Sequence, residues 1–311
     1  MLPYLLTLGA TLSFSGASLI FAHYSRRISV LWMNTFKAFV AFSLLIITLP
    51  ILFTLTGHWS GYMPPTLNST FLLLISGAIG LGIGDLFLLD AFIRIGVSRT
   101  LILYGFQPIA LGLAGSLLFG QTFNSLRLIA VGCLIACLII FNLEHYRENK
   151  RWEIRGFLFA LIGVSLDSGG VLLTRLAFEH SPHSQPLEGH LIRCIGALIF
   201  YSAYSVFLRM RRPTNDQTPV IGLFSNFIRY DRRTRGILFF GCFAGTFLSL
   251  CLYLTAIQIG HLASISAIAI TGPMFAALLE TTLQKKPISR SLAMAFAFFI
   301  AGFVVLLMSA P

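Results

Sequence analysis

The chain has 311 residues, of which 56% are hydrophobic and 11% are charged, whereas roughly a quarter of the residues in a typical soluble domain are charged. A soluble enzyme, a secreted disulfide scaffold and a disordered chain are excluded, because none of them could keep that much apolar surface away from water. The net charge of +11 indicates a nucleic-acid partner only if the basic residues share one surface, so their positions decide its meaning.

Ten apolar stretches follow one another along the chain, each close to the length of about 20 residues that a membrane-spanning helix needs. Helices are expected in lipid because each one satisfies its own backbone hydrogen bonds. The predicted fold class is therefore an all-α integral membrane protein of ten transmembrane helices, in a bacterial-type inner (plasma) membrane. The predicted spans are residues 3–22, 30–55, 70–92, 99–119, 126–143, 156–178, 189–208, 236–257, 263–283 and 291–309.

The basic residues lie on one side of the predicted bundle. Eighteen of the 22 Lys and Arg residues fall in the first, third, fifth, seventh and ninth connections. Because cytoplasmic loops are enriched in Lys and Arg, the odd-numbered loops are predicted to be cytoplasmic and both termini to lie outside. The net charge is then a signature of membrane orientation, and no nucleic-acid partner is expected.

The largest of these connections is the cytoplasmic basic loop 209–235. Its apolar residues Val220, Ile221 and Phe224 precede a cluster of arginines. This order favours a short amphipathic helix that lies on the inner leaflet, where lipid headgroups attract the basic side chains. A solvated connector is the alternative.

The two halves of the chain resemble each other. Residues 9–16, Gly-Ala-Thr-Leu-Ser-Phe-Ser-Gly, match residues 163–170, Gly-Val-Ser-Leu-Asp-Ser-Gly-Gly. Because each half holds an odd number of spans, the second copy must cross the membrane upside down, as in secondary transporters built from inverted repeats. The predicted organisation is a first five-span repeat over residues 1–143, a cytoplasmic linker over 144–155 and a second five-span repeat over 156–311.

Prolines interrupt the fourth and ninth predicted spans at matching positions. The two sites read Gln107-Pro108 and Gly272-Pro273. Breaks at corresponding positions of two repeats point to a binding site near the middle of the membrane. Pro108, Gly272 and Pro273 are therefore predicted to be hinges.

These features resemble the EamA-type members of the drug/metabolite transporter superfamily over nearly the whole chain. The resemblance is carried by the small residues 9–16, by the stretch Gly84–Thr100 and by the two proline-containing spans. The sequence departs from the family at Gly120-Gln121, where members often carry Gly-Glu. The resemblance implies a carrier fold with a central cavity and favours export. It leaves the substrate open among amino acids, sugar phosphates, nucleotide derivatives and drugs.

Several ionisable residues lie inside predicted spans, where a charge usually faces a cavity or a partner. Lys37 and Asp85 lie at similar depths, roughly 10 Å from the cytoplasmic face, and could form a pair. Lys37 and Arg193 are repeat mates in the matching motifs Asn34-x-x-Lys37 and His190-x-x-Arg193.

One interpretation is that Lys37 and Arg193 attract an anionic group such as a carboxylate or phosphate. The other is that Lys37–Asp85 and Arg193–Asp167 are internal ion pairs that hold the bundle together. Asp85 is also a candidate for carrying a coupling proton, because burial favours the protonated form of a carboxyl group.

The predicted function is a secondary transporter that exports a small polar or amphipathic metabolite by alternating access. A flippase for a phosphate-bearing lipid or polyprenyl carrier is the alternative. No enzymatic activity, cofactor or metal site is expected, and one chain suffices as a monomer because it contains both orientations. The predicted substrate-binding residues are Asn34, Lys37, Asp85, Tyr104, Gln107, Asp167, His190, Arg193 and Tyr253.

A remote alternative is an intramembrane aspartyl protease, because Gly82-Ile83-Gly84-Asp85 spells the signature G-x-G-D. That chemistry needs a second carboxylate that shares a proton with the first. No Asp or Glu precedes Asp85 in the sequence, so the partner would have to come from later in the chain.

Overall fold

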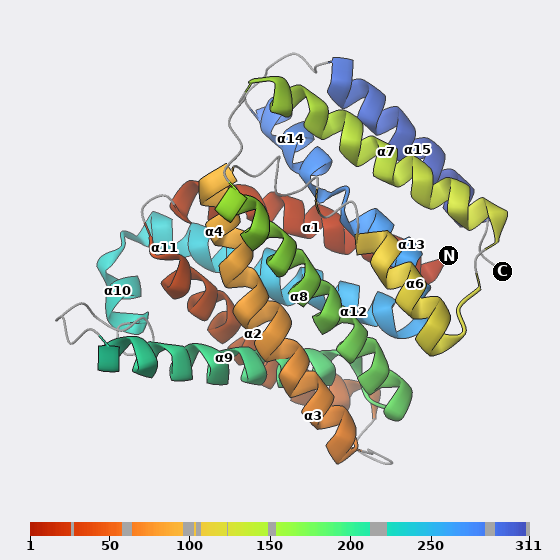
Figure 1. Ribbon diagram of the computed structural model, residues 1–311. Coiled ribbons are helices and arrows are strands. Elements are labelled where there is room, and N and C mark those ends of the chain that lie inside the picture. The colour runs from red at the N-terminus through yellow and green to blue at the C-terminus, as the bar shows by residue number, and fades with distance from the viewer. Residues whose placement is uncertain are drawn as a thin grey trace.

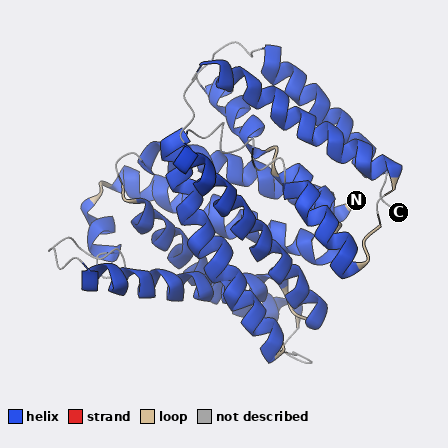
Figure 2. Ribbon diagram, viewed as in Figure 1, coloured by secondary structure: helices blue, strands red, loops and turns tan. Residues whose placement is uncertain are grey.

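The computed structural model describes the following parts of the chain: residues 1–25, 28–57, 64–95, 103, 107–122, 124–148, 154–211, 223–283 and 290–308. Within these residues every regular element is helical and no strand occurs (Figure 2). The all-helical fold class predicted from the sequence is confirmed for this part of the chain.

Seven helices, or uninterrupted runs of helices, are long and apolar enough to cross a membrane. They are α1 (Leu2–Ser25), α2 (Val30–Thr56), the run of α3 (Leu67–Ser76), η1 (Gly77–Gly84) and α4 (Asp85–Ile95), α8 (Ile154–His180), α9 (Pro186–Arg211), the run of α11 (Arg232–Cys242), η2 (Phe243–Leu248) and α12 (Ser249–Ile259), and α15 (Arg290–Met308).

Shorter apolar helices occupy the predicted fourth, fifth and ninth spans. They belong to α6 (Gln107–Phe119), to α7 (Ser125–Glu148), and to α13 (Leu262–Ala269) with the start of α14 (Gly272–Leu283). The chain is therefore a multi-pass membrane protein. The count of ten spans remains a prediction.

The helices of the first half pack mainly on helices of the second half. Helix α1 contacts α12, α13 and α14, while α8 contacts α3, η1 and α4. Helix α2 packs on α9, and α7 packs along α15, which lies beside it at one end of the molecule (Figure 1). The two halves therefore interlock, and neither forms a separate core.

The third and eighth predicted spans share an unusual feature, a π-helical segment in their middle. Segment η1 is eight residues long and η2 is six. Each is followed directly by an α-helix, α4 after η1 and α12 after η2. The π-helix closes its hydrogen bonds over one residue more than the α-helix and often occurs at functional sites.

Glycines in η1 allow close contact with two helices of the second half. A Cβ atom at Gly77 would lie 2.0 Å from the carbonyl oxygen of Arg193 on α9, and a Cβ at Gly170 on α8 would lie 3.2 Å from the Cα of Gly80. The contact with α9 is reciprocal, since a Cβ at Gly196 would lie 2.1 Å from the carbonyl oxygen of Leu74. Small residues at crossings are how membrane helices approach closely, and here they hold both α8 and α9 against the third span.

Both predicted hinge prolines lie in the first turn of a helix, since Pro108 is the second residue of α6 and Pro273 is the second residue of α14. The residues that precede α6, 104–106, lie outside the described residues. Proline lacks a backbone N–H, which the first helical turn does not need. In the ninth span the break falls at Ile270 and Thr271, between α13 and α14, and the Ser15 hydroxyl donates to the carbonyl oxygen of Gly272 at 2.8 Å. The hinge role itself stays a prediction.

The basic loop contains a seven-residue helix, α10 (Leu223–Arg229). Leu223 is buried, and the Phe227 ring stacks on Phe36 of α2 with the ring centroids 4.8 Å apart. The predicted short helix is thus present, but this face packs on the protein and does not face lipid. Val220, Ile221 and the Phe224 side chain lie outside the part of the chain that the structure describes.

The connection between α12 and α13 buries a histidine outside the candidate spans. His261 lies between Ile259 and Leu262, and its side chain is only 8% exposed. Burial, with a smaller effect of the nearby Arg127 charge, lowers the pKa of His261 to about 4, while the Thr122 backbone acts in the opposite direction. His261 is therefore uncharged at neutral pH.

Candidate functional site

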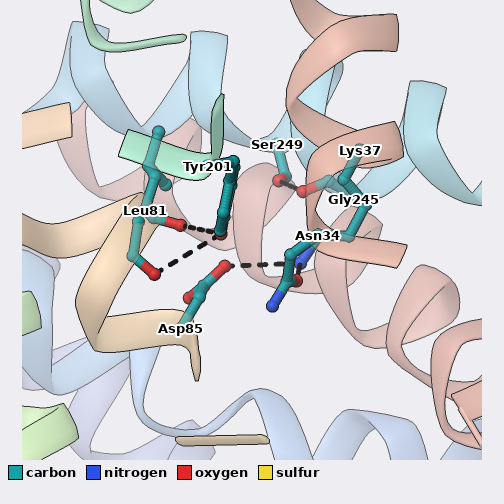
Figure 3. A network of polar contacts seen from close by, with 8 residues as sticks. Asn34, Lys37, Leu81, Asp85, Tyr201, Gly245 and Ser249 are labelled. Atoms are coloured by element: carbon teal, nitrogen blue, oxygen red, sulfur yellow. Dashed lines mark hydrogen bonds and ion pairs between the residues drawn. The ribbon is translucent and has the colours of Figure 1, made fainter. Parts of the chain in front are cut away.

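Lys37 and Asp85 form an ion pair between α2 and α4 (Figure 3). The Lys37 ammonium lies 3.4 Å from Oδ2 of Asp85, and it also donates a hydrogen bond of 3.0 Å to Oδ1 of Asn34. The Lys37 and Asp85 side chains are 14% and 29% exposed. The pair proposed from their similar depths is present, so much of the Lys37 charge is balanced within the protein.

Tyr201 on α9 lies next to this ion pair and was not among the residues selected from the sequence. Its hydroxyl donates to the carbonyl oxygen of Leu81 in η1 at 2.5 Å (Figure 3). The Tyr201 side chain is 1% exposed and interacts electrostatically with Asp85. Tyr201 therefore ties the π-helical segment to α9, a role that a single tyrosine in an apolar stretch does not reveal.

Asp167 on α8 is held by a neutral partner. The Gln107 amide, from the first residue of α6, donates a hydrogen bond of 2.8 Å to Oδ2 of Asp167. No ion pair joins Asp167 to Arg193 among the described residues, although the two interact electrostatically. The direct Arg193–Asp167 ion pair of the alternative interpretation is therefore not formed among the described residues.

Arg193 on α9 is buried, at 2% exposed, and its Nε has no hydrogen-bond partner among the described residues. Its guanidinium lies over Gly80 of η1, where a Cβ atom would be 3.5 Å from Nη2. It lies within electrostatic range of the Asp167 and Asp85 carboxylates, and Tyr253 lies in the same region. A buried cation without a close counter-charge is costly, so Arg193 is the position in this cluster most in need of an anion.

His190 lies one helical turn before Arg193 and is fully buried. Its Nε2 lies 2.9 Å from the carbonyl oxygen of Thr246 in η2. Since a carbonyl oxygen only accepts, Nε2 carries the hydrogen and donates it. His190 thus connects α9 to the second π-helical segment, as Tyr201 connects α9 to the first.

The structure brings most of the predicted residues into one group on α2, α4, α6, α8, α9 and α12. We name it the central cluster; its members are Asn34, Lys37, Asp85, Gln107, Asp167, Arg193 and Tyr253. His190 lies one turn away on α9, and Tyr104 falls outside the described residues. The central cluster holds two cationic and two anionic side chains, so it is neutral when all four are ionised.

The central cluster also contains the two carboxylates that a protease of the G-x-G-D type would need. Asp85 and Asp167 interact electrostatically. However, Asp85 pairs with Lys37 and Asp167 accepts from Gln107. Two carboxylates that each have a different partner do not form the proton-sharing dyad of an aspartyl protease.

The first half of the chain matches a known protein family. Residues 1–143 match the EamA-like transporter family. This match confirms the resemblance stated from the sequence. The EamA-like segment contains Asn34, Lys37, Asp85 and Gln107, whereas the remaining members of the central cluster lie beyond it.

No curated relative matches the chain. Among 29 chains of solved structures that do match, one described only as a crystal structure of a protein is 12% identical. It superposes with a TM-score of 0.73 over 98% of this chain and 96% of its own. A likeness at this level of identity shows a shared fold alone.

Proposed function

We propose that this protein is a secondary transporter for a small metabolite that carries a carboxylate or phosphate, and that Arg193 binds this anionic group. The proposal rests on the EamA-like match of residues 1–143 and on one observation, the buried Arg193 guanidinium, whose Nε has no hydrogen-bond partner in the part of the chain that the structure describes. Arginine suits such a ligand because its planar donors match carboxylate and phosphate oxygens.

Lys37 receives a different role from its repeat mate. Asp85 and Asn34 both contact its ammonium group, which leaves it less able to attract a ligand. We assign Lys37 and Asp85 to an ion pair between α2 and α4, and Arg193 to the substrate. The coupling proton first considered for Asp85 is not part of this proposal, because its carboxylate is assigned to the ion pair with Lys37.

The proposed mechanism is alternating access between two inverted five-helix repeats, with ten spans, both termini outside and export as the direction. Three features support it. Helices of each half pack on helices of the other half, and a π-helical segment occurs in both the third and the eighth span. Pro108 and Pro273, which match in the two repeats, are the second residues of α6 and α14. The repeats would rock around a fixed site, as in other carriers with this internal symmetry.

The test is thermal stabilisation of the purified protein by carboxylates, sugar phosphates and nucleotides, followed by uptake of each hit into proteoliposomes. A ligand at 100 times its dissociation constant should add about 2.7 kcal/mol of stability. We expect Arg193→Gln to lose this effect and Arg193→Lys to keep part of it. The control is Arg94→Gln, since Arg94 is a partly exposed residue that pairs with Asp90 on its own helix.

Two results would contradict the proposal. One is that no anionic compound stabilises the wild type. The other is that Arg193→Gln responds to an anion as the wild type does. Movement of a phosphate-bearing lipid between leaflets, without saturable uptake of any soluble anion, would favour the flippase instead.

A further inference from the structure

We propose that Arg175 is a gating residue, which holds the molecule closed where α12 is followed by α13 and whose release opens the route from that side to the central cluster. This is the predicted outer side of the membrane. The inference rests on the proposed function, because a gate serves a protein that carries its ligand across the membrane. It concerns the transport cycle and leaves the identity of the ligand open.

Arg175 reaches from α8 to the last turn of α12. Its Nη1 donates to the carbonyl oxygen of Ile257 at 2.6 Å, and also to that of Gln258. Its Nη2 lies 2.6 Å from Oε1 of Glu179, one turn further along α8. The last carbonyl groups of a helix have no partner within that helix and carry a partial negative charge, so they attract a cation. Arg175 therefore caps α12 from a different helix.

Gln258 joins the same two segments in the opposite direction. Its Nε2 donates to the carbonyl oxygen of Ser184, in the connection between α8 and α9, at 3.0 Å, and the carbonyl oxygen of Pro182 lies 3.4 Å from the same nitrogen. Water competes for the partners of such bonds, so each one adds little net stability, and the contact can form and break during a transport cycle. We name the bonds that Arg175 and Gln258 make across this contact the latch.

The other side of the connection between α12 and α13 is held by the first half of the chain. Helix α13 packs against α6, which lies beside it in Figure 1. The backbone N–H of Leu262, at the start of α13, donates to Oε1 of Gln121 at 3.0 Å. Residues 258–262 are thus held by α8 on one side and by the segment that follows α6 on the other.

The internal repeat allows a comparison with the opposite end of the molecule. Residues 163–170 match residues 9–16, and Arg175 then corresponds to Phe21 on α1. A phenylalanine ring cannot donate to carbonyl groups. Helices α1 and α4, which correspond to α8 and α12, share no extensive contact in the part of the chain that the structure describes, whereas α8 packs on α12. Arg175, the charged part of the latch, therefore has no counterpart at the matching position.

The latch lies on helices that also contribute to the central cluster. Asp167 precedes Arg175 by about two turns of α8, roughly 12 Å along the helix axis, and Tyr253 lies on α12. Movement of α8 away from α12 at the latch would therefore expose the central cluster to that side. With the latch formed, the structure is in the state that is closed there.

The experiment measures the distance between the ends of α8 and α12 by double electron–electron resonance, in the full-length protein in lipid nanodiscs. Nitroxide labels are attached in His180→Cys and Ile259→Cys, because both residues are exposed and lie close to the latch in the sequence. The native cysteines are buried or partly buried, so the reagent should react first with the two introduced ones.

We expect one short distance when the latch is intact. In Arg175→Met a longer distance should gain population, with the ratio of open to closed molecules raised about tenfold or more, as expected for the loss of hydrogen bonds from a charged donor. Arg175→Lys should restore part of the closed population, because its ammonium group still donates to carbonyl groups. The control is Arg94→Met, since Arg94 also pairs with an acidic residue four positions away on its own helix, Asp90.

An unchanged distance distribution in Arg175→Met overturns the gate. If that variant does not fold, Gln258→Leu replaces it, and the longer distance should again gain population, to a smaller extent. An unchanged distribution in Gln258→Leu then overturns the gate as well.

Binding and uptake separate this inference from the proposed function. A carboxylate or phosphate compound that stabilises the wild type should also stabilise Arg175→Met, while its uptake into proteoliposomes should fall, because the latch does not bind the ligand. Loss of both stabilisation and uptake, as expected for Arg193→Gln, would place Arg175 in the binding site and overturn the gate. If no anion binds the wild type, the proposed function fails, and the label distances still decide whether Arg175 holds this end closed.

Discussion

The crossing of α9 over the third span can be tested with a single methyl group. In Gly77→Ala the new Cβ would lie 2.0 Å from the carbonyl oxygen of Arg193 and 2.6 Å from its carbonyl carbon, whereas ordinary contact begins at 3.4 Å. Both atoms belong to the backbone, so no side-chain rotation relieves the clash. Helix α9 must move away by about 1.4 Å, the difference between 3.4 and 2.0 Å.

We expect a loss of stability near the upper end of the 1–3 kcal/mol typical of overpacking. The reciprocal contact, in which Gly196 of α9 meets the Leu74 backbone, would open in the same movement. For a protein of this size such a loss corresponds to a fall in melting temperature of roughly 5 °C or more. Arg193 moves with α9, so binding of an anionic ligand should weaken as well.

The assay is thermal unfolding in detergent, with Gly169→Ala as the matched control. Gly169 lies inside α8, and a Cβ there would meet nothing within 4 Å. Alanine favours a helix by about 0.5–1 kcal/mol over glycine, so the control should be unchanged or slightly stabilised. If Gly77→Ala has the same melting temperature as Gly169→Ala, the close approach of α9 to η1 is refuted.

Three further outcomes are expected. Tyr201→Phe should cost about 1–2 kcal/mol in unfolding experiments, because it leaves the carbonyl oxygen of Leu81 without its donor; an unchanged melting temperature would show that this bond contributes nothing. A double-mutant cycle of Lys37→Met and Asp85→Asn should give a coupling of about 1 kcal/mol, and additive losses would argue against the pair. His261 has a folded-state pKa of about 4 against about 6.5 when unfolded. It should therefore not affect stability above pH 6.5, and it should destabilise the folded protein by up to roughly 3 kcal/mol as the pH falls from 6.5 to 4, because only the unfolded state takes up the proton. The slope of melting temperature against pH should flatten in His261→Gln, and an unchanged slope would assign the acid sensitivity to other groups.

The sequence predicts the all-helical fold and the apolar segments, and it offers the Lys37–Asp85 pair as one of two interpretations, because hydropathy and depth in the membrane can be worked out for each helix separately. Hydropathy locates a span, and the rise per residue places two charges at similar depths. Helix orientation is harder to predict. Whether Asp167 faces Arg193 or Gln107 depends on how α6, α8 and α9 are rotated against one another, and that is set by contacts between distant segments.

The two π-helical segments are the clearest example of what the sequence does not reveal. A prediction from helical periodicity assumes 3.6 residues per turn throughout. No residue pattern in η1 or η2 predicts the wider turn of a π-helix. The four glycines of η1 indicate close packing, and that is how they act against α8 and α9. The contacts of Tyr201 with η1 and of His190 with η2 depend on this wider turn. Hydropathy alone does not predict them.

Each π-turn acts like an insertion that the chain has absorbed without a loop. Because it takes one residue more to complete a turn, everything after it is rotated by about 100° relative to an unbroken α-helix. The segment η1 thereby sets the azimuth of α4, and with it the direction in which Asp85 points. Deleting one residue from η1 would leave the length and hydropathy of the third span almost unchanged and yet turn Asp85 away from Lys37. In this protein the number of residues in a span determines which way the side chains after the π-helical segment point, and the composition of the span does not.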